Sequence, residues 1–215
     1  MNEEVVVIDF ETSGLSPDYS RTIEVGAAVV NDSGIVQTFS QLMNPGTHIP
    51  SFITALTGIT NGMVLGQPSP EEVMPKLARF IGERPLVAHN ASFDSRFFRA
   101  EMARADIMLS SVFLCTLRLA RRLVPGLPDY KLGTLAAYLG KGSLYSSNAH
   151  RAMHDVEITS EVWNFLRAEA CRLSSTGEAD LEVLQAVMKK AKKSVPGYLK
   201  KLKPVSKAGS VSRTV

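Results

Sequence analysis

Apolar runs near the start of the chain are separated by polar, turn-forming stretches. The run at residues 5–9 predicts a buried strand. Residues 21–30 and 35–42 predict two more strands, because both are rich in β-branched side chains and are separated by the turn-forming sequence at 31–34. We therefore expect an antiparallel hairpin after the first strand.

Further along the chain, apolar residues recur at the three- and four-residue spacing of helices, with short apolar strands between them. Helices are predicted near residues 70–81 and from Phe93, and strands at Leu86 and near Val112. Three more helices are predicted, near Leu117, Leu132 and Val156. The order βββαβαβαα predicts an α/β fold with a mixed sheet flanked by helices and a site at the strand and helix ends.

The composition is typical of a globular protein. The 215 residues suffice for one domain plus an appendage, and 45% of them are hydrophobic. Cys115 and Cys171 lack the spacing of zinc ligands and are too few for a disulfide framework. Glu3 and Glu4 stand where a signal peptide would be basic, and no apolar run approaches the roughly 20 residues of a membrane helix. We therefore expect a cytoplasmic protein.

The net charge of +3 conceals an uneven distribution. The last acidic residue is Glu182, and the segment after it carries eight lysines and Arg213, so that this segment is +9 and the rest of the chain −6. Residues 181–193 have helical apolar spacing, Pro196 and Gly197 are expected to break this helix, and residues 206–215 are expected to be disordered. Two interpretations stay open, an electrostatic arm for nucleic acid and a solubilising, partly mobile tail.

The first predicted strand runs into two carboxylates one residue apart, Asp9 and Glu11. Alternation along a strand places both on one face, with Phe10 on the other. Two anions in one small space favour a hard metal ion with oxygen ligands. The alternative is a strand that simply leads into an acidic loop.

Two later segments offer further carboxylates at helix starts. Asp94 lies in the first turn of the helix from Phe93, and Asp155 lies early in the helix near Val156, five residues after His150. Without a metal, Asp94 would be a first-turn anion favoured by the helix dipole, with Asn90 or Ser92 as the cap.

The pattern Asp9-x-Glu11, then Asn90-x-x-Phe93-Asp94, then His150 before Asp155 resembles the three motifs of the DEDD superfamily of 3′-to-5′ exonucleases, histidine subtype. Residues 21–27 and 115–122 resemble family segments as well, and the resemblance spans about residues 4–172. It implies a ribonuclease H-like fold. On this basis we expect an exonuclease domain at 1–175 and a basic C-terminal extension at 176–215, partly helical and then disordered.

The resemblance also implies the roles of the site residues. Asp9, Glu11, Asp94 and Asp155 would bind two Mg²⁺ or Mn²⁺ ions, with Asp9 on both, Glu11 and Asp155 on the first and Asp94 on the second. His150 would take the proton from the attacking water. The substrate-binding residues would be Thr12, Ser13, Gly14, Leu15, Asn90 and Phe93, of which Leu15 and Phe93 are the candidates for stacking on a base.

The other histidines receive structural interpretations. His154, directly before Asp155, could substitute for His150, but we favour an exposed helical histidine. His89 is interpreted as structural and His48 as a solvated loop residue. Phe97, Phe98 and Trp163 are expected in the core.

The sequence says less about the substrate and the partners than about the site. The resemblance implies release of nucleoside 5′-monophosphates from single-stranded DNA or RNA 3′ ends, with DNA slightly favoured. The alternatives are an RNA-trimming exoribonuclease and a non-catalytic nucleic-acid-binding subunit of the same fold. No clamp-binding pentapeptide is found, so polymerase or sliding-clamp association is unsupported; no membrane partner is expected, and an oligomer is compatible with the sequence.

Overall fold

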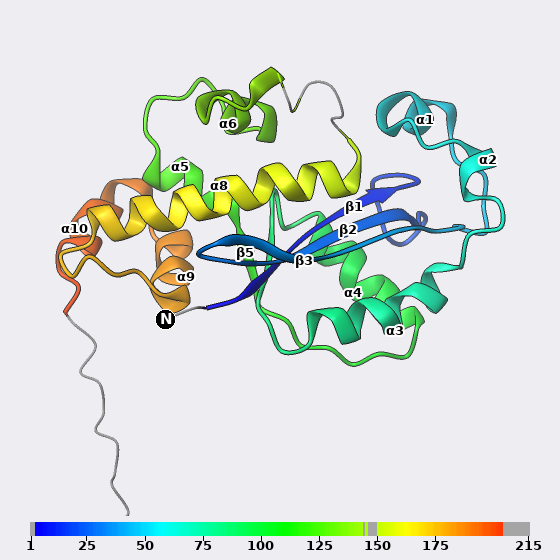
Figure 1. Cartoon of the computed structure of the whole chain (residues 1–215), viewed down its shortest axis with the longest axis horizontal. Coiled ribbons are helices and arrows are strands. Elements are labelled where there is room, and N and C mark those ends of the chain that lie inside the picture. Colours follow the sequence, from blue (N-terminus) through cyan, green and yellow to red (C-terminus); the bar gives the residue numbers. More distant parts are fainter. Residues whose placement is uncertain (1–2, 144, 146–149, 204–215) are drawn as a thin grey trace, which may run out of the picture.

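The computed structural model describes residues 3–143, 145 and 150–203 (Figure 1). Its centre is a five-stranded sheet with strand order β3-β2-β1-β4-β5. The strands are β1 (Val5–Thr12), β2 (Thr22–Asn31), β3 (Gly34–Leu42), β4 (Leu86–Ala88) and β5 (Phe113–Cys115). Because β1 to β3 pair antiparallel while β4 and β5 run parallel to β1, the predicted mixed sheet is confirmed.

Helices cover both faces of this sheet (Figure 1). The long helix α8 (Ala152–Leu173) crosses one face, with α5 (Thr116–Leu123) and α6 (Leu132–Tyr138) packed against it. Helices α3 (Pro70–Ile81) and α4 (Asp94–Arg104) lie on the opposite face. The α/β class and the helices expected in these regions are therefore confirmed.

The core lies between the sheet and these helices. Trp163, Phe97 and Phe98 are almost completely buried, as the helical spacing predicted. The central strands β1 and β2 are apolar on both faces because helices cover both. The charged residues in these two strands are Asp9, Glu11 and Glu24. They lie at the end of the sheet that forms the candidate site.

Two elements beside this end were not predicted. Helices α1 (Ser51–Thr57) and α2 (Asn61–Val64) follow β3. They are too short to show a helical period in the sequence. Ile49, Ile53, Ile59 and Val64 nevertheless pack with Ile23 in a second apolar cluster, which holds the segment against the sheet.

The first strand is longer than predicted. It continues past Asp9 to Thr12, because Glu11 still pairs with Glu24, and Thr12 with Thr22, on β2. The carboxylates therefore lie on a rigid strand and not in an acidic loop, which was the alternative interpretation.

The C-terminal extension packs against the rest of the chain. It forms α9 (Leu181–Lys189), a 3₁₀ turn η1 (Lys192–Ser194) and α10 (Val195–Leu199). Leu184, Val187 and Leu199 are fully buried in the main core. The expectation that Pro196 and Gly197 break the helix is wrong, since α9 already ends at Lys189 and Pro196 lies in the first turn of α10, where proline is well tolerated.

Some expectations concern residues that the structure does not describe. The segment expected to be disordered, 206–215, lies outside the described residues, as does most of the loop before His150, at 144 and 146–149. The boundary at residue 175 stays a prediction. No helix in the described part of the chain is long and apolar enough to cross a membrane.

Candidate active site

The five predicted catalytic residues line one cleft at the carboxyl end of β1. The cleft has a volume of about 1000 Å³. Asp9 and Glu11 come from β1, Asp94 begins α4, and Asp155 lies in the first turn of α8. His150, just before α8, completes this set. The structure thus brings together side chains that are up to 146 residues apart in the sequence.

The geometry suits a cation. One ligand atom from each of Glu11, His150 and Asp155 can lie within 4.8 Å of the others, as in a metal site. Asp94 Oδ1 accepts a hydrogen bond of 3.3 Å from the amide of Phe10, which fixes α4 beside the Asp9–Glu11 pair. Asp155 Oδ1 is buried and has no hydrogen-bond partner among the described residues. An orphaned buried carboxylate oxygen is a natural ligand for a hard divalent ion.

The raised pKa values of the four carboxyl groups also favour a bound cation. Burial raises the pKa of Glu11 to about 8, of Asp94 to about 7 and of Asp155 to about 6. Burial, followed by repulsion from Asp94 and Glu11, raises the pKa of Asp9 well above its ordinary value. The four groups crowd one space with too little positive charge, so a bound cation would stabilise their ionised forms.

A second set of residues, which the sequence reasoning did not single out, positions α8. Glu24 on β2 is opposite Glu11 and binds Arg151 through both carboxylate oxygens, with Arg151 Nη2 2.7 Å from Oε1 and Nε 3.2 Å from Oε2. Its Oε2 also accepts a hydrogen bond of 2.9 Å from the amide of Ala152. A glutamate in an otherwise apolar buried strand was the signal in the sequence.

Gly26 allows α8 to approach β2 closely. A Cβ atom at this position would lie 2.6 Å from the backbone of Ala152 and Met153, so any larger residue would force the helix away. Glu24 and Gly26 alternate on β2 as Glu11 and Asp9 do on β1. The start of α8 is thus placed by β2, the strand next to the one that carries Asp9 and Glu11.

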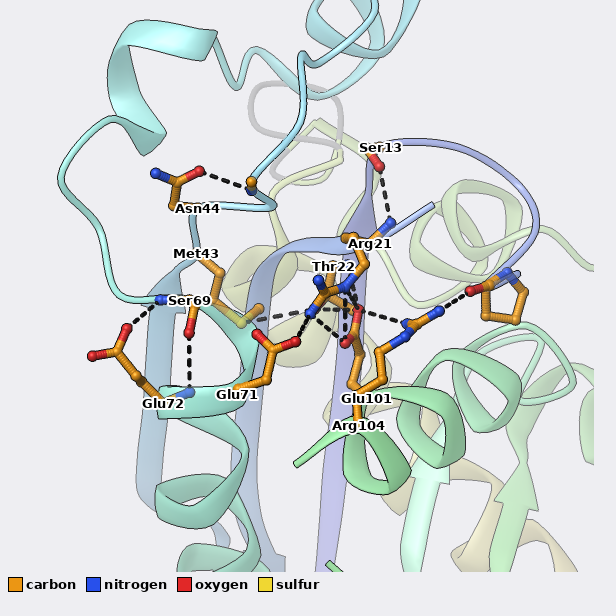
Figure 2. Close-up of polar contacts among 12 residues, drawn as sticks. Ser13, Arg21, Thr22, Met43, Asn44, Ser69, Glu71, Glu72, Glu101 and Arg104 are labelled. Atoms are coloured by element: carbon orange, nitrogen blue, oxygen red, sulfur yellow. Dashed lines mark hydrogen bonds and ion pairs between the residues drawn. The ribbon is translucent and has the colours of Figure 1, made fainter. Parts of the chain in front are cut away.

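A polar network anchors the loop between β1 and β2 (Figure 2). Arg21 donates to both oxygens of the fully buried Glu101 at 3.0 and 3.1 Å and to Glu71 at 2.6 Å. Glu101 also accepts a hydrogen bond of 3.0 Å from the amide of Thr22. Arg104 reaches from Glu101 to the carbonyl of Pro17, so α4 holds the loop at several points.

The predicted substrate-binding residues divide into two groups. Thr12, Leu15, Asn90 and Phe93 line the cleft, and Leu15 is 77% exposed, as a side chain that contacts a ligand would be. Ser13 and Gly14 are not among the lining residues. Ser13 Oγ instead accepts a hydrogen bond of 3.0 Å from the amide of Arg21, and the carbonyl of Gly14 accepts one from Thr12 Oγ1 at 2.6 Å.

The start of α4 differs from the capping prediction. The helix has no side-chain cap, and neither Asn90 nor Ser92 bonds its first amides. Ser92 Oγ donates to Asn90 Oδ1 at 3.2 Å, and Asn90 has a positive φ of 60°. Asn90 thus turns the chain from β4 towards Asp94, a conformation that asparagine adopts more readily than most residues.

His154 is not the exposed helical histidine that we expected. Its side chain is only 11% exposed, because it stacks on Tyr145 with ring centroids 6.1 Å apart and lies 3.7 Å from Glu157. His154 is not among the residues that line the cleft, whereas His150 is. His89 also lines the cleft, and burial lowers its pKa to about 4, so it is neutral near pH 7. Its Nδ1 lies 2.9 Å from Thr116 Oγ1, in agreement with a structural role.

Comparisons with known proteins agree with this geometry. A family model described as "Exonuclease" (RNase_T) matches residues 6–163. The chain is 41% identical over 164 residues to the DNA polymerase III PolC-type protein of Clostridium perfringens. The match covers 76% of this chain but only 11% of that protein. The chain is 37% identical over 159 residues to the DNA polymerase III subunit epsilon of Aquifex aeolicus, covering 74% of this chain and 77% of the relative.

A solved structure described as Exonuclease X in complex with 5′ overhanging duplex DNA has the same fold. It matches with a TM-score of 0.62 and 28% identity, covering 86% of this chain and 99% of that one. The ribonuclease H-like fold is thereby confirmed. Since the family model spans most of the chain and the subunit epsilon relative is 37% identical to it, the chain belongs to the RNase_T family of exonucleases.

Proposed function

We propose that this chain is a metal-dependent 3′-to-5′ exonuclease that releases nucleoside 5′-monophosphates from single-stranded 3′ ends. The observation that carries the proposal is the meeting of Asp9, Glu11, Asp94, Asp155 and His150 in one cleft. A non-catalytic binding subunit would gain nothing from four crowded, buried carboxylates, because they would only repel its polyanionic ligand and destabilise the fold.

The carboxylates would hold two divalent ions, Mg²⁺ or Mn²⁺. The fit rests on the oxygen donor set, the raised pKa values and the orphaned oxygen of Asp155. When bound, such ions polarise a phosphodiester and make a bound water more acidic.

The protein's own groups supply the remaining chemistry. His150 lies against Glu11 and Asp155 and would accept the proton of the attacking water. Leu15 and Phe93 offer apolar surface on which the terminal base can stack. The Arg21–Glu101 network would keep Leu15 in place by fixing the loop that carries it.

DNA is the proposed substrate. The named relatives support this choice, since two are DNA polymerase III proteins and the solved structure was determined with duplex DNA. Because this chain corresponds to 11% of the PolC-type relative, the partners of that protein are not transferred to it, and replicase association stays unsupported. A cytoplasmic location is part of the same proposal, and the two free cysteines suit a reducing compartment.

The proposal can be tested with matched end-labelled DNA and RNA strands of one sequence. In Mg²⁺ and in Mn²⁺, we expect a ladder of products shortened from the 3′ end and mononucleotide 5′-phosphates, with DNA degraded faster. Faster degradation of RNA would identify an exoribonuclease. Binding of either strand with no products under both metals would indicate a non-catalytic subunit and refute the proposal.

A further inference from the structure

Helix α5 borders the candidate active site with cations that have no acidic partner. Among the residues that the structure describes, no carboxylate is within ion-pair distance of Arg118, Arg121 or Arg122, whereas Arg21 and Arg151 pair closely with glutamates. Arg122 Nη1 donates a hydrogen bond of 2.8 Å to the carbonyl of Arg118, and burial, followed by the neighbouring Arg118 and Arg121, lowers the pKa of Arg122. Uncompensated positive charge on a folded surface favours an anionic ligand.

The C-terminal extension adds to this charge and is held in a fixed position. Arg118 Nη2 donates to the carbonyl of Met188 at 2.9 Å, and Arg122 Nε donates to that of Lys190 at 2.9 Å. Both bonds fix the end of α9 against α5. The amide of Cys115, at the end of β5, also contacts Met188 Sδ at 3.1 Å. The lysines that follow α9 therefore have a defined place relative to the cleft.

Tyr130 connects the extension to the cleft. Lys192 Nζ lies 5.9 Å from the centre of the Tyr130 ring, and Tyr130 lines the cleft together with Arg121 and Lys131. Lys193 is exposed beside Lys192. We call these four cations, Arg121, Lys131, Lys192 and Lys193, the basic ridge.

The two ends of the cleft differ in charge. On the side of α1, residues 46–66 contain no Asp, Glu, Lys or Arg, and Ile53, Leu56 and Thr57 line the cleft. On the side of the basic ridge, the acidic residue that lines the cleft is Asp129, whose Oδ1 accepts hydrogen bonds from the amide of Lys131 and the hydroxyl of Thr134. A polyanion that leaves the cleft would therefore be attracted towards the basic ridge.

We propose that the basic ridge binds the phosphates of the substrate strand on the 5′ side of the nucleotides that occupy the cleft. The inference rests on the proposed function and adds a path for the strand, in which α9 and η1 extend the floor of the cleft. Because the lysines are carried by packed elements, less chain entropy is lost on binding than with a flexible arm. The contacts are to phosphates, so they would favour long strands without reading their sequence.

The test compares two double variants of equal charge change. Lys192→Glu/Lys193→Glu alters the basic ridge. Lys200→Glu/Lys201→Glu is the control, because these exposed lysines follow α10, and their neighbours Leu202 and Lys203 line a different cavity from the candidate active site. KM and kcat are measured on 3′ ends of strands of about 4 and about 20 nucleotides, lengths chosen from the usual range of single-strand site sizes.

The ridge variant should raise KM at least about fivefold for the longer strand, and less than twofold for the shorter one, at low salt. Binding of a fluorescent strand of about 20 nucleotides is measured in EDTA, where no turnover occurs. Loss of two contacts should flatten the slope of log affinity against log salt by about 1.4 units, and the control should keep the original slope.

Equal effects of the two double variants, or an unchanged salt slope in the ridge variant, would overturn the proposal. An equal loss on short and long strands would do the same. If the ridge variant is less stable by thermal unfolding, Lys192→Gln/Lys193→Gln replaces it, with the same expected change of about 1.4 units in the salt slope, because both contacts are lost, and a smaller rise in KM, because no repulsion is added. Should the wild-type protein cleave nothing, the binding measurements in EDTA still decide on the ridge, so that its failure and that of the exonuclease proposal remain distinguishable.

Discussion

Glu24 on β2 and Arg151, the residue directly after His150, form an ion pair with a shortest contact of 2.7 Å. His150 has a positive φ of 64°, a conformation that is uncommon for residues other than glycine. The backbone around it must therefore be held by its neighbours, and Glu24 does this by binding both Arg151 and the amide of Ala152. The position of the proposed base thus depends on a glutamate that lies opposite Glu11 in the sheet.

We expect Glu24→Gln to lower kcat by about tenfold or more while changing KM less than threefold, because the start of α8 loses its charged anchor. Stability should fall by about 1–3 kcal/mol, since Ala152 and Arg151 lose a buried charged partner. Steady-state kinetics and urea unfolding would measure both. Glu161→Gln is the matched control, because the exposed pair of Glu161 with Lys141 should contribute less than about 1 kcal/mol. Equal kinetics for the two variants would contradict a positioning role.

The crowded carboxylates predict an unusual dependence of stability on pH. Burial raises the pKa of Glu11 to about 8 and of Asp94 to about 7, so the folded protein binds more protons than the unfolded chain between about pH 4 and pH 8. In EDTA, the free energy of unfolding should therefore decrease as pH rises through this range and level off above it. Thermal unfolding at several pH values would measure the decrease.

Divalent metal should reduce this loss of stability at high pH. With Mg²⁺ or Mn²⁺ at saturating concentration, the loss of stability towards pH 8 should shrink, because the ions bind the ionised carboxylates of the folded state. Lys203→Gln would serve as a control with the same pH dependence as the wild type. A melting temperature at pH 8 that is insensitive to both metals would count against the metal site.

Asp9→Asn should abolish nearly all cleavage and leave the fold intact. The side chain keeps its size but loses the charge of a ligand proposed for both ions. Since repulsion from Asp94 and Glu11 contributes to the raised pKa of Asp9, the variant should also be more stable than the wild type in EDTA near pH 8. Retention of more than about a tenth of the wild-type rate in Mg²⁺ would exclude the two-ion assignment.

The two histidines beside Asp155 should differ sharply. His150→Ala is expected to lower kcat by about 100-fold or more, and His154→Ala by much less, because only His150 lines the cleft. His154→Ala should instead reduce stability, since its ring is stacked on Tyr145. A large rise in the Mg²⁺ concentration required by His150→Ala would show that His150 is a metal ligand, since one of its ring nitrogens lies within 4.8 Å of carboxylate oxygens of Glu11 and Asp155.

The sequence predicted those parts of the site whose chemistry is local. Asp9 and Glu11 were recognisable because strand alternation puts them on one face. Asp94 and Asp155 were recognisable because their order and spacing with Asn90, Phe93 and His150 resemble the exonuclease motifs. Glu24 and Glu101 were not recognised as anchors. Their partners, Arg151 and Arg21, are 127 and 80 residues away, and neither spacing nor propensity indicates such pairings.

The same limit applies to the fold. The long helices and the order of strands and helices along the chain follow from hydrophobic periods, whereas α1 and α2 are too short to show one. The lysine-rich composition after Glu182 suggested a mobile tail, yet the apolar residues between the lysines decide the packing of α9 and α10. Composition describes the surface of this segment, and only its apolar spacing, at Leu184, Val187 and Met188, indicated its buried face.

The packing of α9 changes what removal of the C-terminal segment can reveal. Deletion of all residues after Glu182 would remove Leu184, Val187 and Met188 from the core and the partners of Arg118 and Arg122 from α5. We expect such a protein to be unstable or insoluble, so that weaker binding by it would not identify an electrostatic arm.

Single substitutions separate packing from charge. Leu184→Ala should lower the free energy of unfolding by about 2–4 kcal/mol, because Leu184 is fully buried and a cavity would remain. Lys193→Ala, on the exposed side of the same segment, should change it by less than about 0.5 kcal/mol. Urea unfolding of the two variants measures the difference. If Leu184→Ala were as mild as Lys193→Ala, α9 would not be part of the folded core, and the fixed position that the basic ridge requires would be lost with it.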